Sequence, residues 1–120
     1  MANTFKNDTK SSLVTTALPD ASAVVVTSGS TATLVILSIL VSNKTGTSAN
    51  VDVYLDRNTG DDVYLIRNAP VPAGSSLELV NGNKVILQPA DKIQARSDTA
   101  TSLDVTVSYL EQTPYHGIDS

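Results

Sequence analysis

The sequence predicts an all-β protein that forms a single antiparallel β-sandwich of eight or nine strands, either jelly-roll-like or immunoglobulin-like. Val, Thr and Ser each occur 14 times among the 120 residues, a composition typical of strands with polar outer faces. Short apolar runs are separated by turn residues about every ten residues, the spacing of a sandwich or barrel. No stretch has the apolar spacing and capping residues of an amphipathic helix.

The domain organisation follows from where apolar side chains begin and end. Residues 1–12 have few of them and are expected to form an extended N-terminal arm that something else, most simply another chain, holds in place. Residues 13–111 are expected to form the sandwich, and residues 112–120 a polar C-terminal tail. The expected strands cover residues 13–18, 23–27, 32–43, 49–56, 62–68, 75–80, 84–87, 92–97 and 102–111.

Turn residues set the ends of these strands. Pro19-Asp20 closes the first, and Ser28-Gly29-Ser30 closes the second. The segment 70–74 contains two prolines, which lack the N–H donor that a central strand needs, so it is expected to lie outside a central strand. Asn81-Gly82 is a common two-residue hairpin turn and predicts that the short strands flanking it pair with each other.

Alternation indicates which faces are buried. In the last strand Leu103, Val105 and Val107 share one face with Tyr109, which is typical of a half-buried antiparallel strand. In the strand 49–56 the alternation places Tyr54 on the outer face. If Leu55 pairs with Val63 in the following hairpin, Tyr54 lies opposite Tyr64.

The strand 32–43 does not alternate, because apolar side chains occupy both of its predicted faces. One face holds Val35, Leu37, Ile39 and Val41, and the other holds Leu34, Ile36 and Leu40. A strand buried on both faces needs a second covering layer, which the arm, a neighbouring subunit or the domain's own loops could supply. The candidate interface residues are therefore Phe5, Leu34, Ile36, Leu40, Tyr54 and Tyr64.

Several kinds of chemistry are excluded or disfavoured by composition. The absence of cysteine excludes disulfides, zinc ribbons and thiol nucleophiles. The single histidine, His116, lies in the polar tail, and no Gly-x-Ser-x-Gly motif accompanies it. The segment 56–62 is similar to a calcium loop but departs from the EF-hand template at three positions, so an exposed hairpin loop is expected. We therefore expect no enzyme, cofactor or metal.

The charge distribution disfavours two kinds of partner. The formal net charge is −4, and the 8 Lys and Arg residues are scattered, so no basic patch for nucleic acid is expected. The longest apolar stretch, Leu34–Val41, is far shorter than the about 20 residues that span a bilayer. Residues 1–7 lack the apolar region of a signal peptide, which predicts synthesis in a cytoplasm.

Four segments together form a recognisable pattern: residues 1–7, 68–77, 85–94 and 108–111. Over most of residues 1–111 the chain resembles small virion structural proteins of tailed bacteriophages. In such proteins the turn before Lys92 commonly reads Gly-Asp, whereas this chain has Ala90-Asp91, so that turn need not have a positive φ.

The resemblance implies a structural role without catalysis. The expected function is that of a capsid cement or decoration protein, which binds the major capsid protein on the virion as a symmetric homo-oligomer, with a trimer favoured. A neck or tail accessory or fibre-adaptor protein is the alternative. From the residues alone a carbohydrate- or host-surface-binding module, with Tyr54 and Tyr64 as an aromatic platform, stays open beside it.

Overall fold

The computed structural model describes residues 2–58, 60, 62–80 and 85–113, and all of its strand pairs are antiparallel. Sheet A contains, in spatial order, β1 (Ala2–Lys10), β9 (Leu103–Thr113), β3 (Thr33–Asn43) and then both β6 (Ser76–Glu78) and β7 (Val85–Leu87). Sheet B contains β2 (Val24–Thr27), β8 (Lys92–Ser97), β4 (Ala49–Asp56) and β5 (Val63–Val71). A short 3-10 turn, η1 (Ala21–Ala23), precedes β2.

The strands pair in a nested order. The first pairs with the last (β1 with β9), the second with the one before the last (β2 with β8), β3 with β6 and β7, and β4 with β5. This nesting is the jelly-roll arrangement of two four-stranded layers, with β6 and β7 acting as two halves of one strand. The predicted all-β sandwich is confirmed, and between the two expected topologies the structure has the jelly roll.

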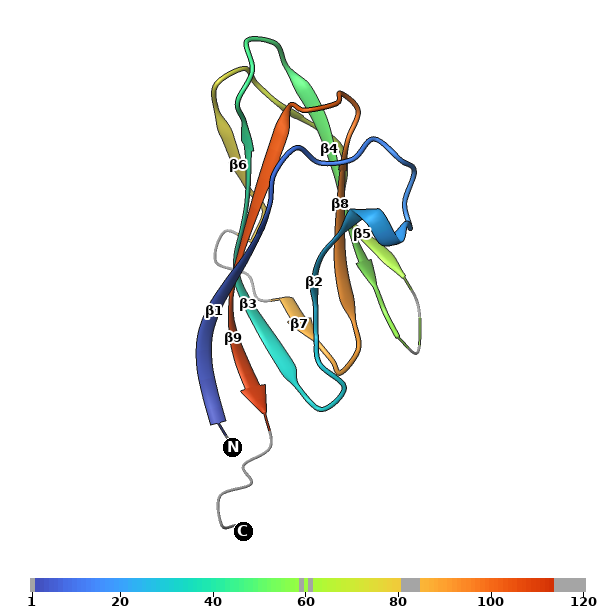
Figure 1. The fold of residues 1–120 in the computed structure, drawn as a ribbon, viewed down its shortest axis with the longest axis vertical. Coiled ribbons are helices and arrows are strands. Elements are labelled where there is room, and N and C mark those ends of the chain that lie inside the picture. Colours follow the sequence, from blue (N-terminus) through green and yellow to red (C-terminus); the bar gives the residue numbers. More distant parts are fainter. Residues whose placement is uncertain (1, 59, 61, 81–84, 114–120) are drawn as a thin grey trace.

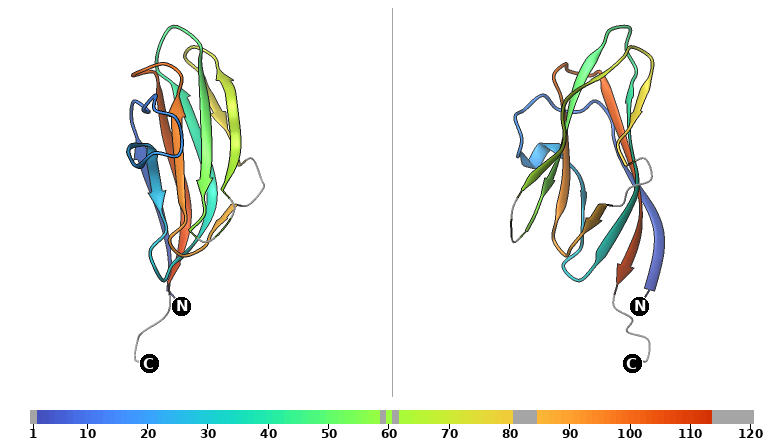
Figure 2. Two further views of the ribbon diagram at one scale, coloured as in Figure 1. Left: turned by 90° about the vertical axis from the view of Figure 1, so that its right-hand side faces the viewer. Right: turned by 180° about the vertical axis from the view of Figure 1, so that it is seen from behind.

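The two sheets pack face to face with a single apolar core between them (Figures 1 and 2). Each central strand contributes alternate side chains to this core, which also includes Leu13 from the segment between β1 and β2. Among the described residues no helix is long and apolar enough to cross a membrane.

The segment expected to be an extended arm is a strand of the domain's own sheet A over residues 2–10. Ala2–Lys10 is a nine-residue strand, and its partner is β9 of the same chain. β9 is a central strand, so its backbone needs hydrogen-bond partners on both sides. β1 supplies the partners on one side through its own backbone, so its polar side chains do not prevent the pairing. The predicted strand 13–18 is wrong: this segment connects the two sheets, and it is held by the Leu13 N–H bond to the carbonyl of Leu103.

The predicted hairpin around Asn81-Gly82 is also wrong. β6 pairs with Leu40–Ser42 and β7 pairs with Leu34–Ile36, so the two short strands lie end to end along β3 rather than side by side. The turn itself lies outside the described residues. β3 has 11 residues, enough to accept both partners on one edge, and this long-range pairing outweighs the local turn preference.

A β-bulge explains why β3 is apolar on both predicted faces. Its pairing with β9 shifts between Ile36 and Ser38, so Leu37 is an extra residue in the strand. Because one extra residue exchanges the faces, Leu34 and Ile36 point inward before the bulge, and Ile39 and Val41 point inward after it. No second covering layer is needed for Leu34 and Ile36, which are buried in the domain's own core, and their prediction as partner contacts is wrong.

The bulge has its own hydrogen-bond partner. The carboxylate of Glu78 on β6 accepts hydrogen bonds from the N–H of Ile39 at 3.0 Å and from the Ser38 hydroxyl at 2.5 Å. It also accepts one from the N–H of Val80. Glu78 therefore satisfies a backbone donor next to the interruption in the β3–β9 ladder.

The bulge makes a prediction about neighbouring residues of β3. Ile36→Ala removes a fully buried side chain and should lower the free energy of unfolding by about 2–5 kcal/mol. Leu37→Ala, one position further, should lower it by less than about 1 kcal/mol because this side chain is 44% exposed. Urea denaturation of both variants measures the difference, and a larger loss for Leu37→Ala would contradict the bulge.

The turn before β8 has a positive φ although it contains alanine in place of glycine. Ala90 has a φ of 68°, in the left-handed region that disfavours residues other than glycine. Its neighbour Asp91 is buried, and the Asp91 carboxylate accepts hydrogen bonds from the N–H groups of Gln88 and Asn58 and pairs with Arg57 at 2.9 Å. These contacts fix the conformation of the turn, in which Ala90 has its positive φ.

Ala90→Gly should therefore stabilise the protein. Glycine adopts a positive φ freely, and relief of the strain outweighs its greater chain entropy, for a net gain of about 0.5–1 kcal/mol. The measurement is the thermal midpoint of unfolding. Ala100→Gly is the matched control, because Ala100 is an exposed turn residue without a positive φ and should show no gain. An equal or lower midpoint for Ala90→Gly would count against this strain.

Candidate interaction surface

The outer face of sheet A has a row of apolar side chains that crosses four strands. Phe5 on β1 is paired with Leu110 on β9, Leu110 with Val35 on β3, and Val35 with Ile86 on β7. Tyr109 on β9, Leu34 and Ile36 on β3 and Leu87 on β7 are buried neighbours on the opposite face, so Leu110, Val35 and Ile86 point away from sheet B, and Phe5 shares their face through its pairing with Leu110.

Two further side chains extend this row. The bulge turns Leu37 outward, and Leu40 follows on the same face. Phe5 is 77%, Leu37 44%, Ile86 38% and Leu40 36% exposed. We call this group the sheet A patch, which comprises Phe5, Val35, Leu37, Leu40, Ile86 and Leu110. A cluster of exposed large apolar side chains is typical of an interaction surface.

Polar contacts on the inner side hold β1 against β9. Lys6 pairs with Glu111 at 2.8 Å, and the hydrogen bond to Glu111 raises the pKa of Lys6. The Tyr109 hydroxyl donates to the carboxylate of Asp8 at 3.0 Å. Burial, together with this hydrogen bond, raises the pKa of Tyr109 to about 12.

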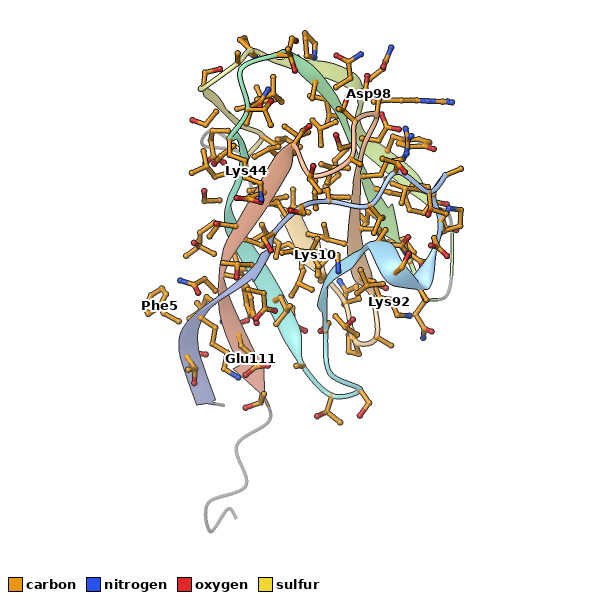
Figure 3. All side chains as sticks on the ribbon, turned by 45° about the horizontal axis from the view of Figure 1, so that its top comes forward. Phe5, Lys10, Lys44, Lys92, Asp98 and Glu111 are labelled. Atoms are coloured by element: carbon orange, nitrogen blue, oxygen red, sulfur yellow. The ribbon has the colours of Figure 1, made fainter. Side chains whose placement is uncertain are left out.

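The end of β1 is held in the same way. The carboxylate of Asp104 accepts hydrogen bonds from the ammonium group of Lys44 at 2.9 Å and from the N–H of Ser12 at 2.8 Å. The hydrogen bond from Lys44 lowers the pKa of Asp104. Figure 3 shows Phe5 pointing away from the body of the domain, with Lys10 further along the same strand and Glu111 on the neighbouring β9.

The Tyr109 contact predicts a loss of stability in alkali. The pKa of Tyr109 is raised in the folded protein, so its contribution is complete below the ordinary tyrosine pKa of about 10 and is lost as the pH rises toward 12. Tyr109→Phe should cost about 1 kcal/mol at neutral pH and remove this part of the alkaline loss. Denaturant unfolding between about pH 7 and pH 12 tests it. Equal alkaline profiles for both proteins would contradict the assignment.

Sheet B has the predicted pair of tyrosines on its outer face. Tyr54 is paired with Tyr64 and Leu55 with Val63, as the alternation indicated. The rings meet edge to face with centroids 5.1 Å apart, and the guanidinium of Arg67 lies 4.9 Å from the Tyr64 ring centre. Arg67 covers one face of the Tyr64 ring, and Tyr54 is only 9% exposed. This geometry stabilises the sheet and leaves no flat platform of two open rings for a sugar.

A pocket of about 240 Å³ lies between η1 and sheet B, lined by Asp20, Asp56, Lys92 and Gln94 among others. The buried Gln94 amide accepts a hydrogen bond from the Asp20 N–H and donates one to the Asp56 carboxylate. These groups hold η1 and the end of β4 together and meet one another's hydrogen-bonding needs.

No group of three His, Cys, Asp or Glu side chains that could hold a metal ion occurs in the described part of the chain. In the segment similar to a calcium loop, Asp56 bonds to Gln94 and Asp62 accepts from the N–H of Arg57. Thr59 and Asp61 of that segment, and His116, lie outside the described residues.

The structure separates the six predicted interface residues into two sets. Phe5, Leu40 and Tyr64 are exposed, whereas Leu34, Ile36 and Tyr54 are buried, and the exposed ones do not share one face. Sequence reasoning missed Leu37 and Ile86 as exposed members of the patch, and the position of Leu110 beside Phe5. Only the strand register, including the bulge, places these side chains together.

Comparison with models of known protein families gives no match, and comparison with curated proteins gives no significant match.

Proposed function

We propose that this chain is a non-enzymatic structural protein of a tailed-phage virion, most simply a decoration protein that stabilises the head lattice. The observation that carries the proposal is the sheet A patch, an apolar surface on a domain whose buried polar side-chain atoms all have partners among the described residues. The resemblance of four sequence segments to small phage virion proteins supports it. Jelly rolls occur in viral capsid domains, although a fold alone does not decide function.

In this proposal the sheet A patch lies against the major capsid protein. Burial of Leu37 on β3 and Ile86 on β7 supplies part of the apolar contribution to binding. Many copies bind one particle, so a modest affinity per copy suffices to reinforce the lattice. The net charge of −4 favours solubility before assembly in the host cytoplasm.

The number of copies per virion tests the location. Quantitative mass spectrometry of purified virions compares this chain with the major capsid protein. A copy number equal to, or a simple fraction of, that of the major capsid protein is the expected result. A few copies, enough for one closed ring, would favour the neck or tail alternative over the head lattice. Its absence from virions would overturn the proposal.

The patch itself is tested with particles stripped of this protein. Leu37→Ser combined with Ile86→Ser should weaken rebinding at least about tenfold, because two exposed leucine-sized contacts are lost while the core is unchanged. Val63→Ser is the matched control, because Val63 is equally exposed but lies on sheet B. Co-sedimentation with the particles measures binding. Equal binding of the double variant and the control would contradict the role of the patch.

A further inference from the structure

β1 leaves one edge of sheet A open. It pairs with β9 along its entire length, and nothing in the described chain pairs with its other side. The N–H and C=O groups on such an edge can accept another strand. The length of nine residues makes this a long edge for a domain of this size.

The other sheet edges are short or irregular and β1 is not. β6 and β7 have three residues each, and β2 has four and a bulge. β5 is longer, but it has two register shifts and contains Pro70. β1 pairs without a shift and has neither proline nor glycine. Charged side chains also hinder edge pairing, and β1 carries charges of both signs, so another strand can pair with it only in a register that brings opposite charges together.

We propose that β1 pairs in antiparallel fashion with β1 of a second copy of this chain. The two-fold axis lies between the two strands at the point where Asn7 of one copy faces Asn7 of the other. Residues 4–10 of each copy then form a seven-residue ladder that joins the two A sheets into one continuous sheet. This pairing is the way in which the protein self-associates, and its biological role rests on the proposed function.

Symmetry limits the possible registers. The two-fold axis must be perpendicular to the sheet, because only then do both inner faces stay on the same side. Directly opposed residues must also share a face. The axis, which lies midway between the two strands, is therefore at the level of one β1 residue, which faces its own copy across the axis, and not at the level of a peptide bond between two residues. The central positions that allow a ladder of useful length are Phe5, Lys6, Asn7 and Asp8.

Charge selects among these registers. An axis at Lys6 places Lys6 opposite Lys6 of the second copy, and an axis at Asp8 places Asp8 opposite Asp8; like charges directly opposite each other are destabilising. An axis at Phe5 pairs no charges. The axis at Asn7 places Lys6 of each copy opposite Asp8 of the other, so two opposite-charge pairs form.

The same register fits the outer face. Phe5, the most exposed large apolar side chain described, lies opposite Thr9 of the second copy, an aromatic and β-branched pair that is favourable in sheets. Both copies then present their sheet A patches on one side of the joined sheet. Two patches on one rigid unit increase avidity for a repeating lattice. This two-fold unit takes the place of the trimer expected from the resemblance.

Sedimentation equilibrium of the isolated protein at micromolar concentrations tests the pairing. The intact protein should form a dimer. Asn7→Lys should raise the dimer dissociation constant at least about tenfold, because it places two lysines opposite each other at the axis. Ala100→Lys adds the same charge on an exposed turn between β8 and β9 and should leave dimerisation unchanged. A monomer at every concentration, or equal effects of the two variants, would overturn the proposal.

The register has a separate test, since the chain has no cysteine. Asn7→Cys should form an intermolecular disulfide on mild oxidation, because directly opposed Cβ atoms in a sheet come within about 4.5 Å of each other, the upper end of the range that a disulfide spans. Phe5→Cys should not, because Phe5 of one copy lies opposite Thr9 of the other. Cross-linking of Phe5→Cys instead of Asn7→Cys would overturn the Asn7 axis.

These measurements use the free protein, and the particle-binding test changes only residues outside β1. Loss of dimerisation with normal particle binding would therefore refute the β1 pairing alone. A dimer that does not bind particles would refute the proposed function alone.

Discussion

The structure depends on the backbone pairing of β9. This strand lies between β1 and β3, and its inner face supplies Leu103, Val105, Val107 and Tyr109 to the core. A strand buried this deeply needs hydrogen-bond partners on both sides. That requirement recruits the polar N-terminal segment as β1 although it has almost nothing to bury. The nesting of first strand against last follows, and with it the open edge that β1 presents.

The bulge at Leu37 is the second constraint, because it decides how the apolar side chains of β3 are shared between core and surface. Without it, either Ile36 or Ile39 would face solvent, since side chains on one face of a regular strand lie at positions that differ by an even number, and these two positions differ by three. With it, both reach the core and Leu37 is left outside. The Glu78 carboxylate accepts a hydrogen bond from the N–H of Ile39 and so stabilises the bulge. The bulge in turn places Leu37 in the sheet A patch.

Polar side chains in this domain hold loops and strands together. Asp91 joins the turn before β8 to Arg57 and Asn58 after β4, and the buried Asn43 donates to the carbonyls of Thr47 and Val71. Asp91 and Asn43 are therefore occupied within the fold, whereas the sheet A patch and the outer edge of β1 have no partner in the described part of the chain.

The sequence by itself determined the all-β class, most strand positions and the pairing of Tyr54 with Tyr64, because alternation and turn residues act over a few neighbouring positions. It also brought Phe5 and Leu40 to notice as apolar residues without an obvious place in the core. Only the tertiary structure decided that β6 and β7 share β3, that β1 belongs to the domain, and that Leu34 and Ile36 are buried. Each of these depends on pairing between residues far apart in the chain. The bulge left one trace in the sequence, apolar side chains on both predicted faces of residues 32–43, but strict alternation interprets that trace as burial on both faces.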